Sequence, residues 1–420
     1  MTALQNLNHR IHKLATLLQL HGVESAIEGS LQLDSVHSED SCLLIKGNNL
    51  TALTSLTRAC ESSIDFCYID PPYNTGQQFV YRDDRTKASS GIWRTHHDWM
   101  AFMLPRLTAA QLLLQPGGVI AISIDDYEYT QLKVLMDNIF GEENYLATLV
   151  VCRSKNGKGS KQHVAVNHEY VLLYGKSRDV TLLGLEESET RVYDKRDEHG
   201  EFTLDGLFRK KGDASLKEDR PNMHYPLYYS PDGKVFTENI GDDLKMVLPR
   251  DSKGIDRRWL WGIDKARTES WKLYASPKGV IYVKNYNTHN KRVKLRSILD
   301  SSSYLTDRAT TELKEIFHHK VFETPKPISL IRDLIDCCSH SNATILDFFA
   351  GTGTTAEAAW ELNQRDGSNR KVILIEQTQV ISADHIARRS GFERITDITE
   401  HRLKHIQRCS NGFTYTTLTC

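Results

Sequence analysis

Long hydrophobic runs are missing from this chain of 420 residues, and no signal peptide is recognisable in it. A membrane-spanning helix needs about 20 consecutive apolar residues, and a secretory signal needs a shorter apolar core behind basic residues. The absence of both predicts a cytoplasmic protein without membrane contacts.

An excess of charge of one sign is also missing. The 53 Lys and Arg residues are balanced by 54 Asp and Glu residues, and the formal net charge is −1. Any surface that binds nucleic acid must therefore be a local patch. The eight cysteines form no C-x-x-C pair and no Cys/His cluster, which predicts reduced thiols and no metal site. With 40% hydrophobic and 25% charged residues, the chain is long enough for one large domain or two.

The most informative stretch of the chain begins with the apolar run Ile64–Ile69, which predicts a strand buried on both faces. Asp70 follows at the carboxyl end of this strand, where open α/β sheets place their ligand sites. An exocyclic amine of a base could donate one hydrogen to the Asp70 carboxylate and the other to the Pro71 carbonyl, which would make its nitrogen more nucleophilic. Pro72 stiffens the loop, and Tyr73 offers a ring for stacking on the base. The alternative is an ordinary strand end followed by a proline-rich turn.

A second motif lies far downstream, where residues 343–355 predict a short strand, a glycine-bearing turn and the start of a helix. Gly351 and Gly353 allow the backbone to approach a ligand, and the helix N-terminus favours an anionic group. The next strand ends in Glu376, a position from which a carboxylate binds ribose hydroxyls. The third glycine of a dinucleotide motif is missing, which argues against NAD. The alternative is an ordinary βαβ turn.

Together, D-P-P-Y at 70–73 and F-x-G-x-G at 349–353, in this order and with a long insert between them, resemble the β-class amino DNA methyltransferases. The extended form D-P-P-Y-N-T-G is most similar to the modification subunits of type III restriction-modification systems and to related solitary enzymes. The resemblance implies a Rossmann-like α/β fold with a doubly wound, mostly parallel sheet, permuted motif order and an inserted DNA-recognition domain. It also implies methyl transfer from S-adenosylmethionine to N6 of a flipped adenine in double-stranded DNA. Open alternatives are N4 of cytosine as the acceptor, an RNA substrate, a non-catalytic DNA-binding subunit and a nucleotide-dependent dehydrogenase.

The resemblance also implies the roles of individual residues. Lys326, in the segment T-P-K-P, would pair with the cofactor carboxylate, although a surface lysine is the simpler alternative. Asn48 stands where the family usually has an aspartate that binds the cofactor. The catalytic residues would be Asp70, Pro71, Pro72 and Tyr73. The other cofactor-binding residues would be Asp347, Phe348, Phe349, Ala350, Gly351, Thr352, Gly353, Thr354 and Glu376.

Four segments are expected along the chain. They are an N-terminal helical segment (1–40), the catalytic half of the methyltransferase domain (41–179), a target-recognition insert (180–310) and the cofactor-binding half (311–420). The last segment is expected to include a C-terminal helix over about 383–407. Basic residues suited to DNA phosphates or base edges lie in a glycine-bearing loop and in the insert; they are Lys155, Lys158, Lys161, Arg257 and Arg258. The resemblance further implies a homodimer and leaves open a separate restriction subunit.

Overall fold

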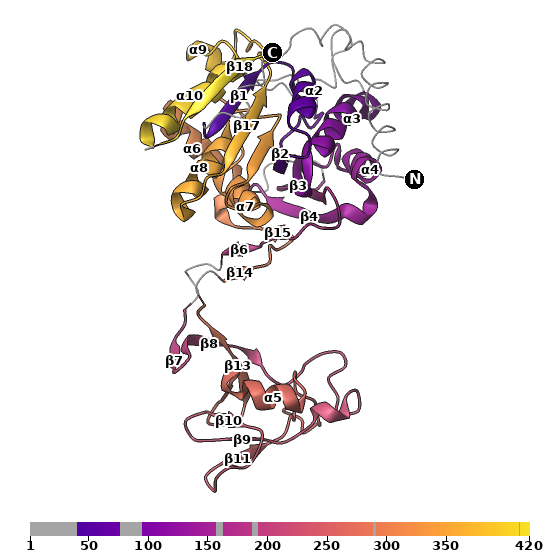
Figure 1. Ribbon diagram of the computed structural model, residues 1–420, viewed down its shortest axis with the longest axis vertical. Coiled ribbons are helices and arrows are strands. Elements are labelled where there is room, and N and C mark those ends of the chain that lie inside the picture. The colour runs from indigo at the N-terminus through magenta and orange to yellow at the C-terminus, as the bar shows by residue number, and fades with distance from the viewer. Residues whose placement is uncertain (1–39, 76–94, 157–162, 187–191, 289–290, 411) are drawn as a thin grey trace. The chain divides into compact units, whose positions relative to one another are not determined.

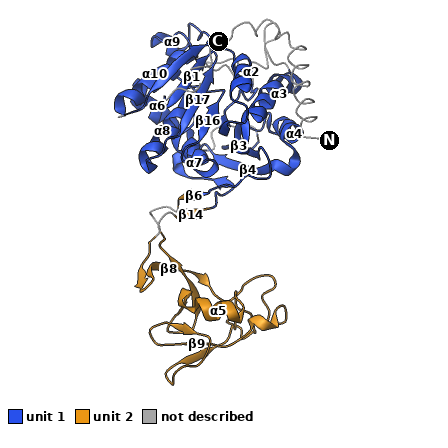
Figure 2. Cartoon of the chain, viewed as in Figure 1, with its two compact units in different colours: residues 1–185, 294–420 blue, residues 186–293 orange. Residues whose placement is uncertain are grey.

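The computed structural model describes residues 40–75, 95–156, 163–186, 192–288, 291–410 and 412–420. The predicted N-terminal helical segment lies almost entirely outside these residues, as do Lys158 and Lys161. The chain forms two compact units, one of residues 1–185 and 294–420 and one of Glu186–Val293 (Figure 2). The second unit falls within the range 180–310 expected for the insert. Among the described residues, no helix combines the length and the apolar character needed to cross a bilayer.

The first unit is built on a nine-stranded sheet with the order β15-β4-β5-β3-β2-β16-β17-β1-β18. Strand β5 is antiparallel to both of its neighbours, and the other neighbouring pairs are parallel. This arrangement confirms the predicted mostly parallel sheet. The strands are β1 (Cys42–Lys46), β2 (Ile64–Ile69), β3 (Leu114–Ile124), β4 (Tyr145–Cys152), β5 (His168–Gly175), β15 (Ile298–Leu299), β16 (Thr344–Asp347), β17 (Lys371–Glu376) and β18 (Tyr415–Thr419).

Helices cover both faces of this sheet (Figure 1), and each face has its own hydrophobic core. Successive side chains of β2 alternate between the two cores: Cys67 and Ile69 enter one, whereas Phe66 and Tyr68 enter the other. Because both faces of β2 are buried, its sequence is mostly apolar and does not alternate between apolar and polar residues. The first core includes α2 (Asn49–Ala59), α3 (His96–Leu113) and α4 (Tyr129–Phe140); the second includes α7 (Ile328–Cys338), α8 (Thr354–Asp366) and α10 (Ile395–Cys409).

The two halves of the unit meet where β2 pairs with β16 in parallel, with Ile345 opposite Phe66 and Leu346 opposite Cys67. From β2 the sheet continues to β3 on one side, and from β16 it continues to β17 on the other. The chain therefore diverges from this pair in opposite directions, which opens a crevice beyond the carboxyl ends of the two strands. Asp70 and Asp347 both lie at this edge.

The C-terminal region differs from the prediction of one helix over about 383–407. The structure has a short helix α9 (Ile386–Arg389) and then α10, which begins at Ile395. Gly391 lies between them with a φ of +91°, a left-handed conformation that ends a helix. The apolar spacing of the two helices is continuous enough to mimic a single helix, so the prediction was wrong at this break. Helix α6 (Thr306–Phe317) packs with α10 in a third, smaller core.

The second unit has a core of its own, which includes Phe208, Leu227, Trp259 and Leu273. The short strands β6 (Leu185–Glu186) and β14 (Arg292–Val293) pair where the chain enters and leaves this unit. Its sheets have the orders β12-β13-β8-β7 and β10-β9-β11. The elements are β7 (Lys195–Asp197), β8 (Gly200–Leu207), β9 (Leu227–Tyr229), β10 (Val235–Phe236), β11 (Lys245–Val247), α5 (Ile263–Glu269), β12 (Leu273–Ala275) and β13 (Ile281–Tyr286).

Candidate active site

The loop after β2 is held by a hydrogen bond within the loop and by hydrogen bonds to Trp99 and Glu128. The Tyr73 hydroxyl donates to Oδ1 of Asp70 at 2.6 Å, and the indole N–H of buried Trp99 donates to the Pro72 carbonyl at 2.7 Å. Asn74, buried with a φ of +57°, donates from its side chain to Oε1 of Glu128 at 2.6 Å. Glu128 is fully buried before α4 and gave no signal in the sequence. These contacts fix the Asp70 carboxylate at the end of the strand.

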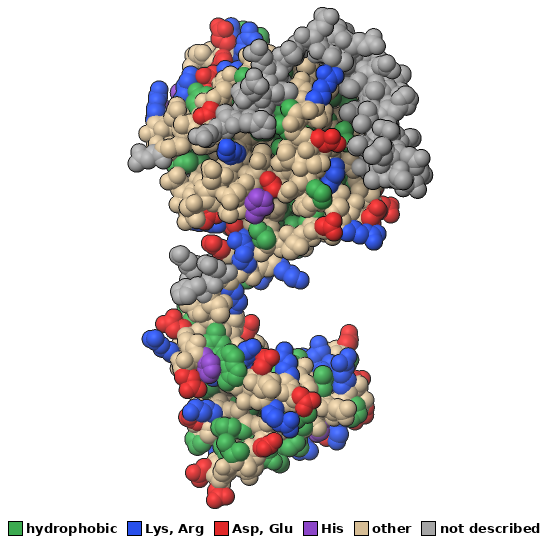
Figure 3. Space-filling model, in the orientation of Figure 1, with side chains coloured by type: hydrophobic (Ala, Val, Ile, Leu, Met, Phe, Trp, Pro, Cys, Tyr) green, Lys and Arg blue, Asp and Glu red, His purple; other side chains and the backbone are tan. Residues whose placement is uncertain are grey.

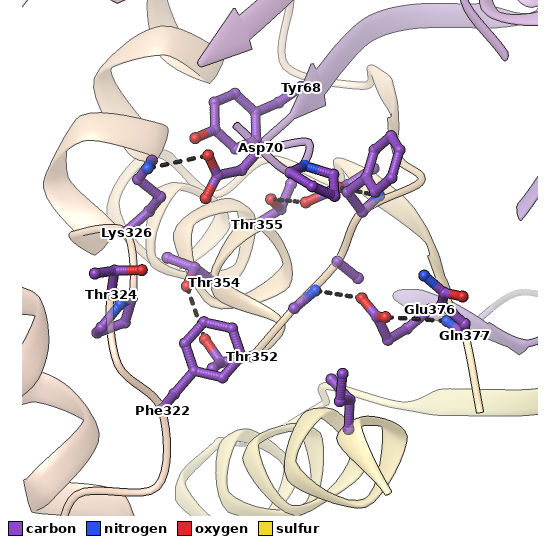
Figure 4. Close-up of a pocket in the computed structure, with 17 residues that line it drawn as sticks. Tyr68, Asp70, Phe322, Thr324, Lys326, Thr352, Thr354, Thr355, Glu376 and Gln377 are labelled. Carbon is purple, nitrogen blue, oxygen red and sulfur yellow. Dashed lines mark hydrogen bonds and ion pairs between the residues drawn. The ribbon is translucent and has the colours of Figure 1, made fainter. Parts of the chain in front are cut away.

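Lys326 reaches the same carboxylate from the loop before α7. Its ammonium nitrogen lies 3.0 Å from Oδ1 of Asp70 and 3.2 Å from Oε2 of Glu169, which belongs to β5 (Figure 4 shows the first of these contacts). It also donates to the Tyr73 hydroxyl at 2.8 Å. Burial opposes a charge here, but the carboxylates of Asp70 and Glu169 raise the pKa of Lys326 above its ordinary value.

Two buried carboxylates, Asp347 and Glu376, end the neighbouring strands β16 and β17. Glu376 accepts the backbone N–H of Gly351 at 2.6 Å on one oxygen and that of Gln377 at 3.0 Å on the other. Burial raises the pKa of Glu376 to about 8 and that of Asp347 to about 7, although hydrogen bonds to each carboxylate oppose the shift. A carboxylate oxygen with one donor can accept a second, so Glu376 retains the capacity to bind hydroxyl groups.

The glycine-bearing turn leads directly into α8. Gly353, with a φ of +81°, precedes the helix, and no side chain caps its first turn. The N–H of Ala356 donates to the Gly353 carbonyl at 3.2 Å, so the N–H groups of Thr354 and Thr355 are the ones that could bind an anionic ligand.

Arg402 of α10 supports this turn and was not identified from the sequence. Its guanidinium is 1% exposed; it pairs with Glu357 of α8 and donates to the hydroxyls of Thr352 and Thr354, each at 2.9 Å. Arg402 lies about 50 residues beyond the turn in the sequence, and one arginine in an amphipathic helix carries no local signal of this role.

One cavity brings the two distant motifs together. Its lining combines the end of β2, the loop before α7, the glycine-bearing turn and the end of β17 (Figure 4). The lining residues include Tyr68, Asp70, Pro72, Phe322, Thr324, Pro325, Lys326, Asp347, Phe349, Ala350, Gly351, Thr352, Thr354, Thr355, Glu376 and Gln377. The predicted catalytic carboxylate and the predicted cofactor-binding carboxylates therefore face a common space.

A second, outer cavity meets the first at Asp70 and Lys326. Its lining residues include Asp70, Tyr73, Asp125, Asp126, Tyr127, Arg153, His168, Glu169, Tyr304, Thr306 and Lys326. Arg153 lies two residues before Lys155, the first of the lysines predicted to contact DNA, and it gives the lining of this cavity a positive charge. The Asp70 carboxylate thus forms part of the boundary between two adjoining spaces.

Several predicted cofactor residues lie outside the lining of the inner cavity. Phe348 is fully buried in the core. Asn48 is exposed and caps α2, because its side chain accepts the backbone N–H groups of Leu50 and Thr51. The neighbouring Asn49 is instead buried and donates to the Phe348 carbonyl at 2.9 Å. Asn49 therefore links the catalytic half to the glycine-bearing turn, one position away from the predicted residue.

The predicted DNA-contacting residues lie in different surroundings. Lys155 is exposed, whereas Arg257 is bound to Asp251 and Ser215 within the second unit. Arg258 is 8% exposed and donates to the Ala214 carbonyl, so its position does not support a contact with DNA. On the face of the second unit shown in Figure 3, Lys and Arg side chains are intermixed with Asp and Glu.

An open, mostly parallel α/β sheet with buried carboxylates at the crevice where the strand order reverses is the arrangement of a ligand-binding α/β protein. The chain belongs to the DNA methylase family, which matches residues 64–386. It is 50% identical to the type II methyltransferase M.KpnI of Klebsiella pneumoniae over 415 residues, 98% of this chain and 99% of that protein. These matches confirm the resemblance found in the sequence.

A second relative is the Mod subunit of the type III restriction-modification enzyme EcoPI of Escherichia phage P1. It is 34% identical over 407 residues, 87% of this chain and 62% of that subunit. Among solved structures, TTHA0409 of Thermus thermophilus, crystallised with S-adenosylmethionine, is 15% identical, with a TM-score of 0.40; the match covers 89% of this chain and 98% of that one.

We expect Arg402→Met to lower the free energy of unfolding by about 3–5 kcal/mol, because it leaves the Glu357 carboxylate buried without its charge partner. Urea unfolding followed by circular dichroism measures the change. Arg408→Met is the matched control on the same helix, since Arg408 is exposed and its loss should change stability by less than about 0.5 kcal/mol. Equal effects of the two substitutions would contradict this role for Arg402.

Proposed function

We propose that this protein methylates DNA at N6 of adenine, with S-adenosylmethionine as the methyl donor and with the target base flipped out of the double helix. Family membership supports the DNA methylase activity. The choice of adenine rests on Asp70, because in the family an acid at this motif position is typical of adenine enzymes. The observation that carries the proposal is the inner cavity, in which Asp70 faces the same space as Asp347 and Glu376.

The residues of the inner cavity fit the chemical groups of S-adenosylmethionine. Glu376, whose oxygens each hold one backbone donor, can accept ribose hydroxyls. The N-terminus of α8, which lacks a side-chain cap, suits the carboxylate of the methionine part. When bound, this cofactor supplies an electrophilic methyl group on a sulfonium.

The acceptor amine would be held at Asp70. One hydrogen of the amine is donated to the Asp70 carboxylate and the other to the Pro71 carbonyl, so that the nitrogen lone pair is available for attack. The lone pair forms the new N–C bond while the electrons of the S–C bond stay on sulfur, and the positive charge on nitrogen is lost when a proton leaves to water. The ionised Asp70 stabilises this charge as it develops.

The outer cavity would take the flipped base, because it adjoins the inner cavity at Asp70 and contains the Tyr73 ring. Flipping costs a few kcal/mol of stacking and pairing energy, and a stacking contact with Tyr73 offsets part of it. We assign target recognition to the second unit, and phosphate contacts to the loop of Arg153 and Lys155. A homodimer, a restriction subunit as a further partner and a cytoplasmic location are consistent with this function.

The product of the reaction tests the proposal directly. Unmethylated double-stranded DNA is incubated with the protein and with S-adenosylmethionine labelled in the methyl group, and is then digested to nucleosides. We expect the label in N6-methyladenine. Label in N4-methylcytosine would establish the other acceptor, and no incorporation of label would contradict the proposed activity.

Asp70→Ala should reduce methyl transfer by at least about 10²-fold, because the carboxylate acts on the developing positive charge. Cofactor binding should persist, since the groups assigned to the nucleoside belong to β16, β17 and α8. Transfer of labelled methyl groups and calorimetric titration with S-adenosylhomocysteine measure the two properties. Glu61→Gln, an exposed position before the other end of β2, serves as the control. Retained turnover in Asp70→Ala would exclude the assigned role.

Cofactor affinity should fall as the pH decreases below about 8, because a protonated Glu376, with its pKa raised to about 8, accepts ribose hydroxyls less well. The loss should approach tenfold per pH unit below this pKa. Glu376→Gln should bind weakly at every pH and lose this step. Glu61→Gln is the control, because Glu61 is exposed and does not line the inner cavity, and its loss should leave the step in place. Titrations between pH 6 and 9 that show constant affinity would contradict the expectation.

A further inference from the structure

The Asp70 carboxylate is held through one of its two oxygens. Both donors, the Tyr73 hydroxyl at 2.6 Å and the Lys326 ammonium at 3.0 Å, contact Oδ1. Oδ2 has no hydrogen-bond or ion-pair partner within the described part of the chain. Figure 4 shows Lys326 approaching one oxygen of Asp70 while the other oxygen points toward the interior of the cavity. Oδ2 is therefore the oxygen of Asp70 that can accept a hydrogen bond from an incoming amine.

A second carboxylate lies behind Lys326. Glu169, 5% exposed on β5, contacts the ammonium at 3.2 Å. Glu169 lines the outer cavity and is not among the residues that line the inner one. Two ionised carboxylates and one ammonium give the cluster a net charge of −1.

We propose that Lys326 is a positioning residue that orients Asp70 for the amine, and that Glu169 anchors Lys326 and offsets its charge. The inference rests on the proposed methyl transfer and deepens it. This role differs from the one implied by the family resemblance, in which Lys326 pairs with the cofactor carboxylate. We favour it because the ammonium already has two carboxylate partners and one hydroxyl partner.

The charges explain why both partners are needed. Without Lys326, the Asp70 carboxylate would lose one of the two donors that hold Oδ1 and could rotate away from the position that suits the amine. Without Glu169, Asp70 and Lys326 would form a neutral pair, and the positive charge that develops on the amine would lose net stabilisation. Lys326 thus orients the Asp70 carboxylate, and Glu169 keeps the net charge of the cluster negative.

Lys326→Met tests the first part through the separate effects on kcat and on KM for DNA. Loss of the ammonium should lower kcat by about tenfold or more, because Asp70 loses a donor that orients its carboxylate, while KM for DNA changes little. Lys326→Arg should restore part of the lost kcat. Thermal unfolding and titration with S-adenosylhomocysteine, run alongside, separate this effect from a loss of fold.

Glu169→Gln tests the second part and keeps nearly the same shape, so it remains informative if Lys326→Met does not fold. We expect kcat to fall by about tenfold or more while KM for DNA changes little.

These outcomes distinguish a failure of the proposed function from a failure of the proposed roles of Lys326 and Glu169. If the unaltered protein transfers no methyl group to DNA, the proposed function fails. If it is active and Asp70→Ala is not, then an unchanged kcat in Lys326→Met or in Glu169→Gln overturns the positioning role alone. A weaker affinity of Lys326→Met for S-adenosylhomocysteine with an unchanged kcat would overturn it in favour of a contact with the cofactor.

Discussion

The parallel pairing of β2 with β16 is the constraint on which the rest of the site depends. The two strands have only 6 and 4 residues, yet nearly 280 residues of chain separate Phe66 from its partner Ile345. The register places both carboxyl ends at one edge, and each strand is stiffened by a core on both faces. A shift of this pair by one residue would turn the side chains of β2 to the opposite faces and move Asp70 away from Asp347.

Around this pair, the loop after β2 and the glycine-bearing turn are each held by residues from other elements. Trp99 holds the Pro72 carbonyl, Glu128 holds Asn74, and Arg402 holds the hydroxyls of the glycine-bearing turn. Preorganisation of this kind matters in electrostatic catalysis, because donors and acceptors that are already in place need no reorganisation during the reaction. The site is therefore a property of the whole first unit.

The sequence was sufficient to predict the groups that end strands. Asp70, Asp347 and Glu376 follow apolar runs, and the period of a strand together with the topology of parallel sheets predicts where their carboxylates lie. Contacts that depend on tertiary packing could not be predicted. Glu169 is 157 residues from Lys326 and is one acid in an otherwise apolar strand. The break at Gly391 shows the same limit, because apolar spacing predicts that a helix forms but not the residue at which it ends.

The shared wall of the two cavities has a thermodynamic consequence. The charge of Asp70 contributes to the raised pKa of Asp347, so the proton occupancy of a group in the inner cavity depends on a group that also faces the outer one. A ligand that neutralises or shields Asp70 from the outer side must change the free energy of ionising Asp347. By reciprocity, occupation of either space alters the affinity of the other by the same factor. The order in which two ligands fill the two cavities would thus change the path of binding and leave the free energy of the doubly occupied state unchanged.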